Sequence, residues 1–172
     1  MKQLLLLRHA HAEETRSGLA DIDRALSPRG RAEALDAARS IGGAGLQCEA
    51  VLVSPAVRAR ETATIVAAEL DLVVGLSFEP ALYLGNPDAL LAPLRRCPSG
   101  LKTLLMVGHN PGLSELAQRF NGAAPAIELR TAGLCAITFA AEAVWGELRP
   151  QWATVITLQR RVAGPLTLSA AA

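Results

Sequence analysis

The sequence has little excess of charge of either sign. Its 172 residues include 17 lysines and arginines and 16 aspartates and glutamates, so the formal net charge is +1. This balance gives no overall field that would attract nucleic acid or an anionic membrane surface, and it excludes proteins that bind by bulk charge. Any binding of anions must therefore come from a few basic residues placed together.

Cysteines are few, and long apolar runs are absent. Cys48, Cys97 and Cys135 are far apart and lack the spacing of a metal site, so we expect reduced thiols packed in the core. The apolar start, residues 1–7, is too short for a signal segment, and no run is long enough to span a bilayer. These absences predict a soluble, cytoplasmic protein.

Apolar residues are plentiful. A hydrophobic content of 51% and a mean hydropathy of +0.27 are ample for a large core. We find no repeat, linker or shift in composition that would divide the chain. The sequence therefore predicts one domain over residues 1–172, with a small-residue tail after about residue 164 that is poorly anchored.

Short runs of Val, Leu and Ile alternate with longer segments of helical period, which is typical of an α/β layer fold. The expected strands, of which the first, second and fourth are the most central, are residues 3–7, 50–53, 76–78, 103–107, 134–139 and 154–158. The expected helices are residues 28–43 after an N-cap at Ser27, 56–70, one beginning at Asn86-Pro87 and shortened by Pro93, and about 111–120. We predict a three-layer α/β/α sandwich with a mostly parallel sheet.

Basic and polar residues follow three of the apolar runs. Arg8 and His9 end the run LLLLRHA, Ser54, Arg58 and Arg60 follow VLV, and His109 follows LLMVG. In open α/β sheets, ligands bind in the crevice beyond the carboxyl ends of the strands. We therefore expect these side chains to converge, although they are scattered along the chain.

The residue types at this predicted site favour phosphate chemistry. Guanidinium groups bind a phosphate bidentately, and the helices after Ser54 and Gly108 would add backbone N–H donors. A neutral imidazole at His9 can attack phosphorus, and His109, protonated or donating, would stabilise the phosphoryl oxygens. With four such cationic donors no metal ion is required, and we expect no cofactor.

These motifs resemble the histidine phosphatase superfamily, in particular its short SixA-type phosphohistidine phosphatases. The segments LLLRHA, DRALSPRGRAEA, VLVSPAVRARETA and LLMVGHNPG carry the resemblance, which covers roughly residues 2–160. It implies a phosphoglycerate mutase-like fold. It also implies that His9 is the nucleophile, that Arg8 and Arg58 bind the phosphoryl group, and that His109 is the second pocket histidine.

The sequence departs from the family pattern at two positions. Ala10 replaces the glycine of the Arg-His-Gly signature, and we expect a right-handed backbone there, without loss of chemistry. Mutase-like members carry a glutamate proton donor after the third strand, where this chain has Leu84. The resemblance therefore implies a site without its usual acid.

Several polar residues near the motifs have simpler interpretations. His11 fits a solvated loop side chain, Arg60 and Glu61 an exposed ion pair, and Ser54 the cap of the helix that presents Arg58. Arg24 and Arg29 are expected to be solvated. Trp145, Trp152 and Phe139 are expected to pack in the core. Acidic residues that lie near the motifs, none of them supported by spacing, are Glu13, Glu14, Asp21, Asp23 and Asp88.

The leading functional hypothesis is a metal-independent phosphatase that forms a phosphohistidine intermediate and removes phosphate from phosphohistidine on a partner protein. One alternative is a small-molecule phosphomonoesterase or mutase of the same superfamily. Another is a phosphate-binding module without turnover, which is less consistent with a histidine at position 9 because arginines alone would suffice for recognition. The sequence does not decide the proton donor, the partner or the order of the strands.

Overall fold

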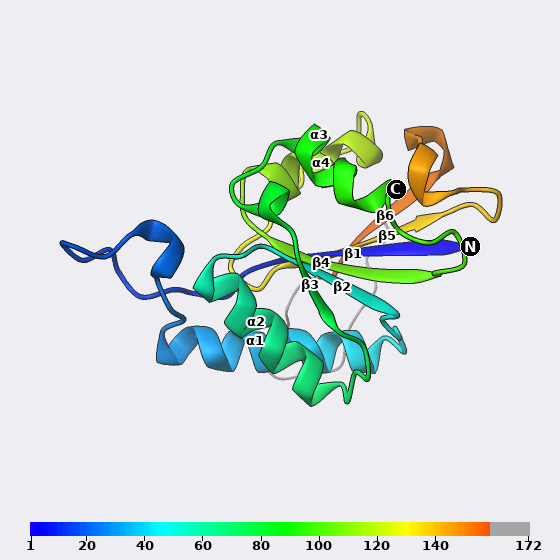
Figure 1. Cartoon of the computed structure of the whole chain (residues 1–172). Helices are drawn as coiled ribbons and strands as arrows, with labels where there is room; N and C mark the ends of the chain where they lie inside the picture. The colour runs from blue at the N-terminus through cyan, green and yellow to red at the C-terminus, as the bar shows by residue number, and fades with distance from the viewer. Residues whose placement is uncertain (159–172) are drawn as a thin grey trace.

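The computed structural model describes residues 1–158, which form a six-stranded sheet with helices on both faces (Figure 1). The strands are β1 (Lys2–Arg8), β2 (Ala50–Val53), β3 (Leu76–Phe78), β4 (Thr103–Gly108), β5 (Leu134–Phe139) and β6 (Ala153–Leu158). The α-helices are α1 (Pro28–Gly43), α2 (Val57–Glu69), α3 (Pro87–Leu94) and α4 (Gly112–Asn121). Short 3-10 helices are η1 (Asp21–Asp23), η2 (Pro80–Leu82), η3 (Trp145–Glu147) and η4 (Pro150–Trp152). The predicted elements are confirmed, with ends that agree to within about one residue.

The order of the strands in the sheet is β3-β2-β4-β1-β5-β6. Strands β3, β2, β4 and β1 pair in parallel, whereas β5 runs antiparallel to both β1 and β6. The mostly parallel α/β/α architecture is therefore confirmed. The strands predicted to be the most central, β1, β2 and β4, are indeed neighbours in the middle of the sheet.

The core has two halves, one on each face of the sheet. Leu5 and Leu7 of β1 face α1 and α2, whereas Leu4 and Leu6 face α3 and α4. Because successive side chains of a strand point to opposite faces, a strand covered on both faces must be apolar throughout. This explains the uninterrupted LLLL run. Trp145 and Phe139 are buried in the second half and Trp152 packs against it, as predicted.

Side chains cap two of the helices, and the cap at Ser27 is the one that the sequence predicts. Ser27 Oγ accepts a hydrogen bond from the Gly30 N–H at the start of α1, and Asn86 Oδ1 accepts one from the Ala89 N–H at the start of α3. Helix α3 ends at Leu94, one residue after Pro93. Both caps satisfy backbone donors that a helix leaves unpaired at its first turn.

The Ser27 cap gives a test of stability. Ser27→Ala removes the acceptor for the Gly30 N–H and the partner of His11 Nδ1, which lies 2.8 Å from Ser27 Oγ. We expect the free energy of unfolding to fall by ~1 kcal/mol, measured from the midpoint of urea denaturation. The exposed Ser17→Ala serves as control and should change it by less than ~0.5 kcal/mol. Equal stability of the two variants would show that the cap does not stabilise α1.

The predicted loose tail after about residue 164 lies outside the described residues. Within residues 1–158, no helix combines the length and the apolar character needed to cross a membrane. Cys48 and Cys135 are buried, Cys97 is half-buried, and all three are free thiols.

Candidate active site

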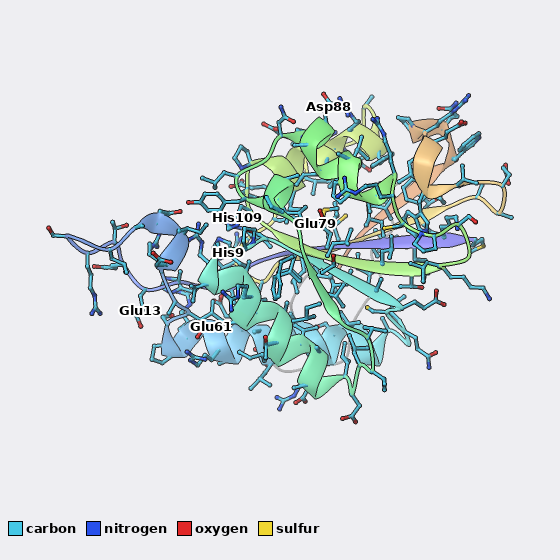
Figure 2. All side chains as sticks on the ribbon, viewed as in Figure 1. His9, Glu13, Glu61, Glu79, Asp88 and His109 are labelled. Carbon is cyan, nitrogen blue, oxygen red and sulfur yellow. The ribbon has the colours of Figure 1, made fainter. Side chains whose placement is uncertain are left out.

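Three strand ends bring the predicted residues together at one edge of the sheet (Figure 2). Arg8 is paired with Gly108 across β1 and β4, and the His9 N–H donates to the Gly108 carbonyl at 3.0 Å. The Ser54 N–H donates to the Val107 carbonyl of the same strand, also at 3.0 Å. Parallel pairing therefore places His9, His109 and the loop that leads into α2 side by side, as the sequence predicts.

Arg8 has an unused donor at this edge. Its Nη1 donates to the Leu129 carbonyl at 2.9 Å, whereas its Nε is buried and, among residues 1–158, has no hydrogen-bond partner. Burial lowers the pKa of the guanidinium from its ordinary value. A buried N–H without a partner costs free energy, and an anion would supply the missing acceptor. The position of Arg8 therefore fits a phosphoryl oxygen.

His9 is held as a neutral base. Its Nδ1 lies 2.8 Å from the Ala10 carbonyl oxygen, which can only accept, so Nδ1 carries the proton and Nε2 keeps its lone pair. Burial, with the charges of Arg58 and Arg8, lowers the pKa of His9 to about 4. At neutral pH the ring is therefore uncharged, and its unprotonated Nε2 can attack phosphorus.

Arg58 lies in the first turn of α2 and reaches both histidines. Its Nε donates to His9 Nε2 at 3.3 Å, and its Nη2 lies 3.4 Å from His109 Nδ1. The two imidazole rings are close neighbours, with centroids 4.9 Å apart. The Arg58 side chain is only 4% exposed, so its position is fixed by the surrounding protein. The guanidinium therefore contacts both imidazole rings from a fixed position.

Both ring nitrogens of His109 have hydrogen-bond partners. Since the Arg58 guanidinium can only donate, His109 Nδ1 is an acceptor, and its Nε2 donates to Ser54 Oγ at 2.7 Å. Burial and the charges of His9 and Arg58 lower the pKa of His109 to about 3. The free protein therefore holds His109 neutral, chiefly because the ring is buried, and a protonated or donating His109 beside a bound phosphate stays a prediction.

Ser54 differs from its predicted role. Helix α2 begins at Val57 after an N-cap at Ala56, so Ser54 is not the cap residue. The Ser54 hydroxyl accepts from the Ala56 N–H at 3.3 Å and contacts His109 Nε2. It therefore fixes the His109 ring rather than the helix that carries Arg58.

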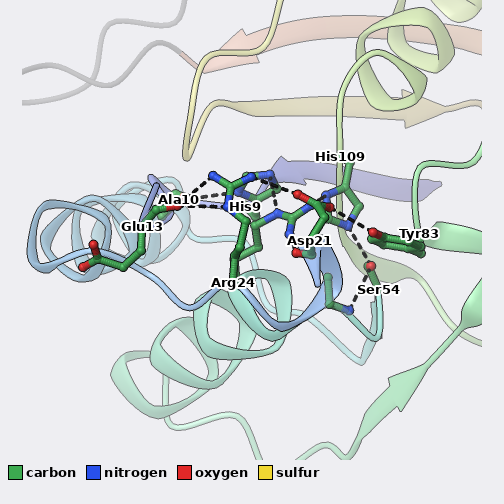
Figure 3. Close-up of polar contacts among 10 residues, drawn as sticks. His9, Ala10, Glu13, Asp21, Arg24, Ser54, Tyr83 and His109 are labelled. Atoms are coloured by element: carbon green, nitrogen blue, oxygen red, sulfur yellow. Dashed lines mark hydrogen bonds and ion pairs between the residues drawn. The ribbon is translucent and has the colours of Figure 1, made fainter. Parts of the chain in front are cut away.

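Two residues that lie in none of the quoted strand-end motifs, Asp21 and Tyr83, complete the site (Figure 3). Asp21 of η1 accepts at Oδ2 from Arg58 Nη2 at 2.8 Å and from the Tyr83 hydroxyl at 2.9 Å. Burial raises the pKa of Asp21, but hydrogen bonds from Arg24, Arg58 and Tyr83 outweigh it and hold the pKa well below its usual range. The Tyr83 and His109 rings pack nearly perpendicular to each other, with centroids 5.5 Å apart. The sequence named Asp21 only as one of five acidic residues near the motifs, without support from spacing. For Tyr83 the one available indication was its position next to Leu84, where the family carries its glutamate.

Other predicted residues lie outside the pocket or have different contacts. His11 is not simply solvated, because Ser27 binds its ring and Glu33 accepts from its backbone N–H at 3.0 Å. Arg24 is likewise not solvated: it donates to the Glu13 carbonyl and to Asp21. Arg29, whose side chain is 70% exposed, pairs with Glu33.

The predicted pair of Arg60 and Glu61 does not form. Arg60 lies over the Phe78 ring, and Glu61 pairs with Arg31 at 2.8 Å. Adjacent helix residues point in directions about 100° apart, which explains why each finds a partner on a different neighbouring element.

The departures from the family pattern do not disturb the pocket. Ala10 is buried and is not among the residues with positive φ, so the left-handed backbone that would strain an alanine is excluded there. Leu84 is 57% exposed and Asp88 pairs with Arg119, so neither supplies an acid to the histidines. Of the acidic candidates, Asp21 is the one bonded to Arg58.

Comparisons of the sequence agree with this geometry. The sequence profile of the histidine phosphatase superfamily (branch 1) matches residues 4–82, which include Arg8, His9 and Arg58. An uncharacterized protein of Mycobacterium tuberculosis is 30% identical over 164 residues, which are 87% of this chain and 96% of that protein. An uncharacterized chloroplastic protein of Arabidopsis thaliana is 32% identical over 139 residues, which are 76% of this chain but only 63% of the plant protein.

Solved structures share the fold. A protein assigned as phosphohistidine phosphatase SixA from Nakamurella multipartitia superposes with a TM-score of 0.81 and 24% identity, over 94% of this chain and 97% of that one. The protein histidine phosphatase SixA complexed with tungstate has a TM-score of 0.72 and 25% sequence identity, over 80% of this chain and 88% of that one. Mycobacterial glucosyl-3-phosphoglycerate phosphatase has a TM-score of 0.61 and 16% sequence identity, over 86% of this chain and 95% of that one. The chain belongs to the histidine phosphatase superfamily, and its fold is that of the SixA-type members.

Proposed function

We propose that the protein is a phosphatase that transfers a phosphoryl group to His9 and then to water, with phosphohistidine on a partner protein as its substrate. The observation that carries the proposal is the state of His9. Its Nδ1 proton is held by the Ala10 carbonyl, and its Nε2 lone pair faces the guanidinium of Arg58. A base held neutral beside fixed cations is what attack on a phosphoryl group requires.

The two arginines divide the binding of the phosphoryl oxygens. The guanidinium of Arg58 offers N–H donors beside His9, and Nε of Arg8, which has no hydrogen-bond partner among residues 1–158, offers a further donor. Transfer of a phosphoryl group depends mainly on positioning and on stabilising charge on the oxygens. Both guanidinium groups act in this way without change of their own charge. The prediction that no cofactor is needed rests on these donors.

The missing glutamate favours phosphohistidine over phosphate esters. An alkoxide leaving group needs a positioned acid, and Leu84 stands where the family would supply one. An imidazole whose second nitrogen is protonated leaves as a neutral molecule and needs no such acid. The protein histidine phosphatase SixA, which is 25% identical to this chain, supports the choice of phosphohistidine as substrate. Its complex with tungstate supports the binding of a phosphate-like anion.

The substrate screen tests this proposal. We expect kcat/KM for a phosphohistidine peptide to exceed that for phosphoserine and 3-phosphoglycerate by ~10²-fold or more, because only the esters need the acid. The assay measures released phosphate with and without EDTA, and activity should survive EDTA. Comparable values for the three substrates would instead support the small-molecule phosphatase, an alternative whose fold a glucosyl-3-phosphoglycerate phosphatase shares. Binding of phosphate without turnover of any substrate would instead support the other alternative, a phosphate-binding module that is not an enzyme.

A further inference from the structure

Asp21 places a carboxylate in the position where a phosphoryl oxygen would bind. Its Oδ2 accepts from Arg58 Nη2 at 2.8 Å, and its backbone carbonyl accepts from Arg58 Nη1. Arg58 Nη2 also lies 3.4 Å from His109 Nδ1, and its Nε contacts His9. One guanidinium therefore connects Asp21 with both histidines, and Figure 3 shows the cluster.

The two partners of this ion pair differ in their freedom to move. The Arg58 side chain is 4% exposed, whereas that of Asp21 is 43% exposed. A phosphoryl group that takes the Nη2 donor must therefore displace the carboxylate and not the guanidinium. The backbone carbonyl of Asp21 can remain bonded to Nη1 while its carboxylate moves away from Nη2. After this exchange the carboxylate lies beside the phosphoryl group and has lost a cationic donor.

Hydrogen bonds from two other groups keep the displaced carboxylate near the site. Arg24 Nη1 donates to Oδ1 at 2.9 Å, and the Tyr83 hydroxyl donates to Oδ2. Tyr83 in turn packs against His109. Loss of the bond to Arg58 removes one of the causes that lower the Asp21 pKa, and the phosphoryl dianion raises it further. The carboxylate therefore becomes a better proton acceptor when phosphate is bound.

We propose that Asp21 is a catalytic residue, the general base for hydrolysis of the phosphorylated His9, an inference that rests on the proposed function. Water attacks phosphorus and forms the new P–O bond, while the P–N bond to His9 Nε2 breaks and its electron pair returns to the ring. One proton of the water passes to the Asp21 carboxylate, and the other stays on the inorganic phosphate. His9 keeps its Nδ1 proton on the Ala10 carbonyl throughout.

The first half of the reaction does not need this base. With phosphohistidine or p-nitrophenyl phosphate, the leaving group departs without a strong demand for a proton, and His9 is already neutral. Removal of the base should therefore slow only the second half. A residue that merely holds Arg58 in place would affect both halves, because Arg58 binds the phosphoryl group in both.

The test is rapid-quench kinetics of Asp21→Asn with p-nitrophenyl phosphate, in the full chain. We expect a burst of about one p-nitrophenol per protein at a rate near that of the wild type, followed by turnover slower by ~10²-fold. Acid-labile, base-stable phosphate should accumulate on His9. Asp23→Asn is the matched control: it removes the same charge from the exposed end of η1, and its turnover should equal that of the wild type.

A second variant separates loss of the base from a change of shape. Formate added to Asp21→Ala should raise the rate of the second half at least ~10-fold and leave the burst rate unchanged. Equal losses in burst and turnover, no rescue by formate, or normal turnover of Asp21→Asn would each overturn the role of Asp21. A wild-type protein that neither turns over p-nitrophenyl phosphate nor forms a phosphoenzyme would instead refute the proposed function itself.

Discussion

Replacement of His9 by alanine should abolish turnover while leaving the binding of inorganic phosphate largely intact. The nucleophile is lost, but both guanidinium groups stay, since Arg8 is held by the Leu129 carbonyl and Arg58 by Asp21. Steady-state assays with p-nitrophenyl phosphate would measure the loss. Titration calorimetry with inorganic phosphate would measure binding. In the wild type, a rapid quench with labelled substrate should trap an acid-labile, base-stable adduct on His9.

His11→Ala provides the matched control for this variant. His11 is a nearby histidine on the same segment, and its ring contacts Ser27 rather than Arg58. Its removal should leave turnover unchanged. Label found on Ser54, or on no residue, would show that the covalent mechanism assigned to His9 is wrong.

Replacement of Arg58 by lysine should reduce kcat by ~10²- to 10³-fold, comparable to the loss of an oxyanion donor. Lysine keeps the charge but not the planar fork. The Arg58 fork contacts His9 through Nε, and Asp21 and His109 through Nη2. A single ammonium group cannot donate hydrogen bonds to all these partners at once, so the phosphoryl group would lose its bidentate contact. Steady-state kinetics with p-nitrophenyl phosphate would measure the effect, with circular dichroism to confirm the fold.

Arg60→Lys is the control on the same helix. Arg60 is exposed and lies over the Phe78 ring, outside the contacts of the two histidines. Its kcat should match that of the wild type. Near-normal kcat in Arg58→Lys would contradict the role of the guanidinium in the pocket, whatever the behaviour of Arg60→Lys.

The sequence by itself determined the architecture, and it predicted that Arg8, His9, Arg58 and His109 lie together. Strand and helix signals are local, and they correctly predicted the bounds of β1, β2 and β4, the cap at Ser27 and the start of α3 at Asn86-Pro87. A parallel sheet then forces its strand ends to one edge, so Arg8, His9 and His109 could be expected to meet. The position after the second strand offered both Arg58 and Arg60, and the family resemblance selected Arg58, which lies in the first turn of α2.

Only the tertiary structure decided the state and the partners of those residues. Asp21 is 37 residues from Arg58 and 62 from Tyr83 along the chain, and it lies in a short turn that has no period to place it. The neutral forms of His9 and His109 depend on their burial beside the arginines, which no motif specifies. Likewise, Ser54 bonds to His109 and Glu61 to Arg31 because separate elements converge there. Protonation and pairing of side chains follow from distances in space, whereas the sequence pattern specifies only the elements that bring the side chains together.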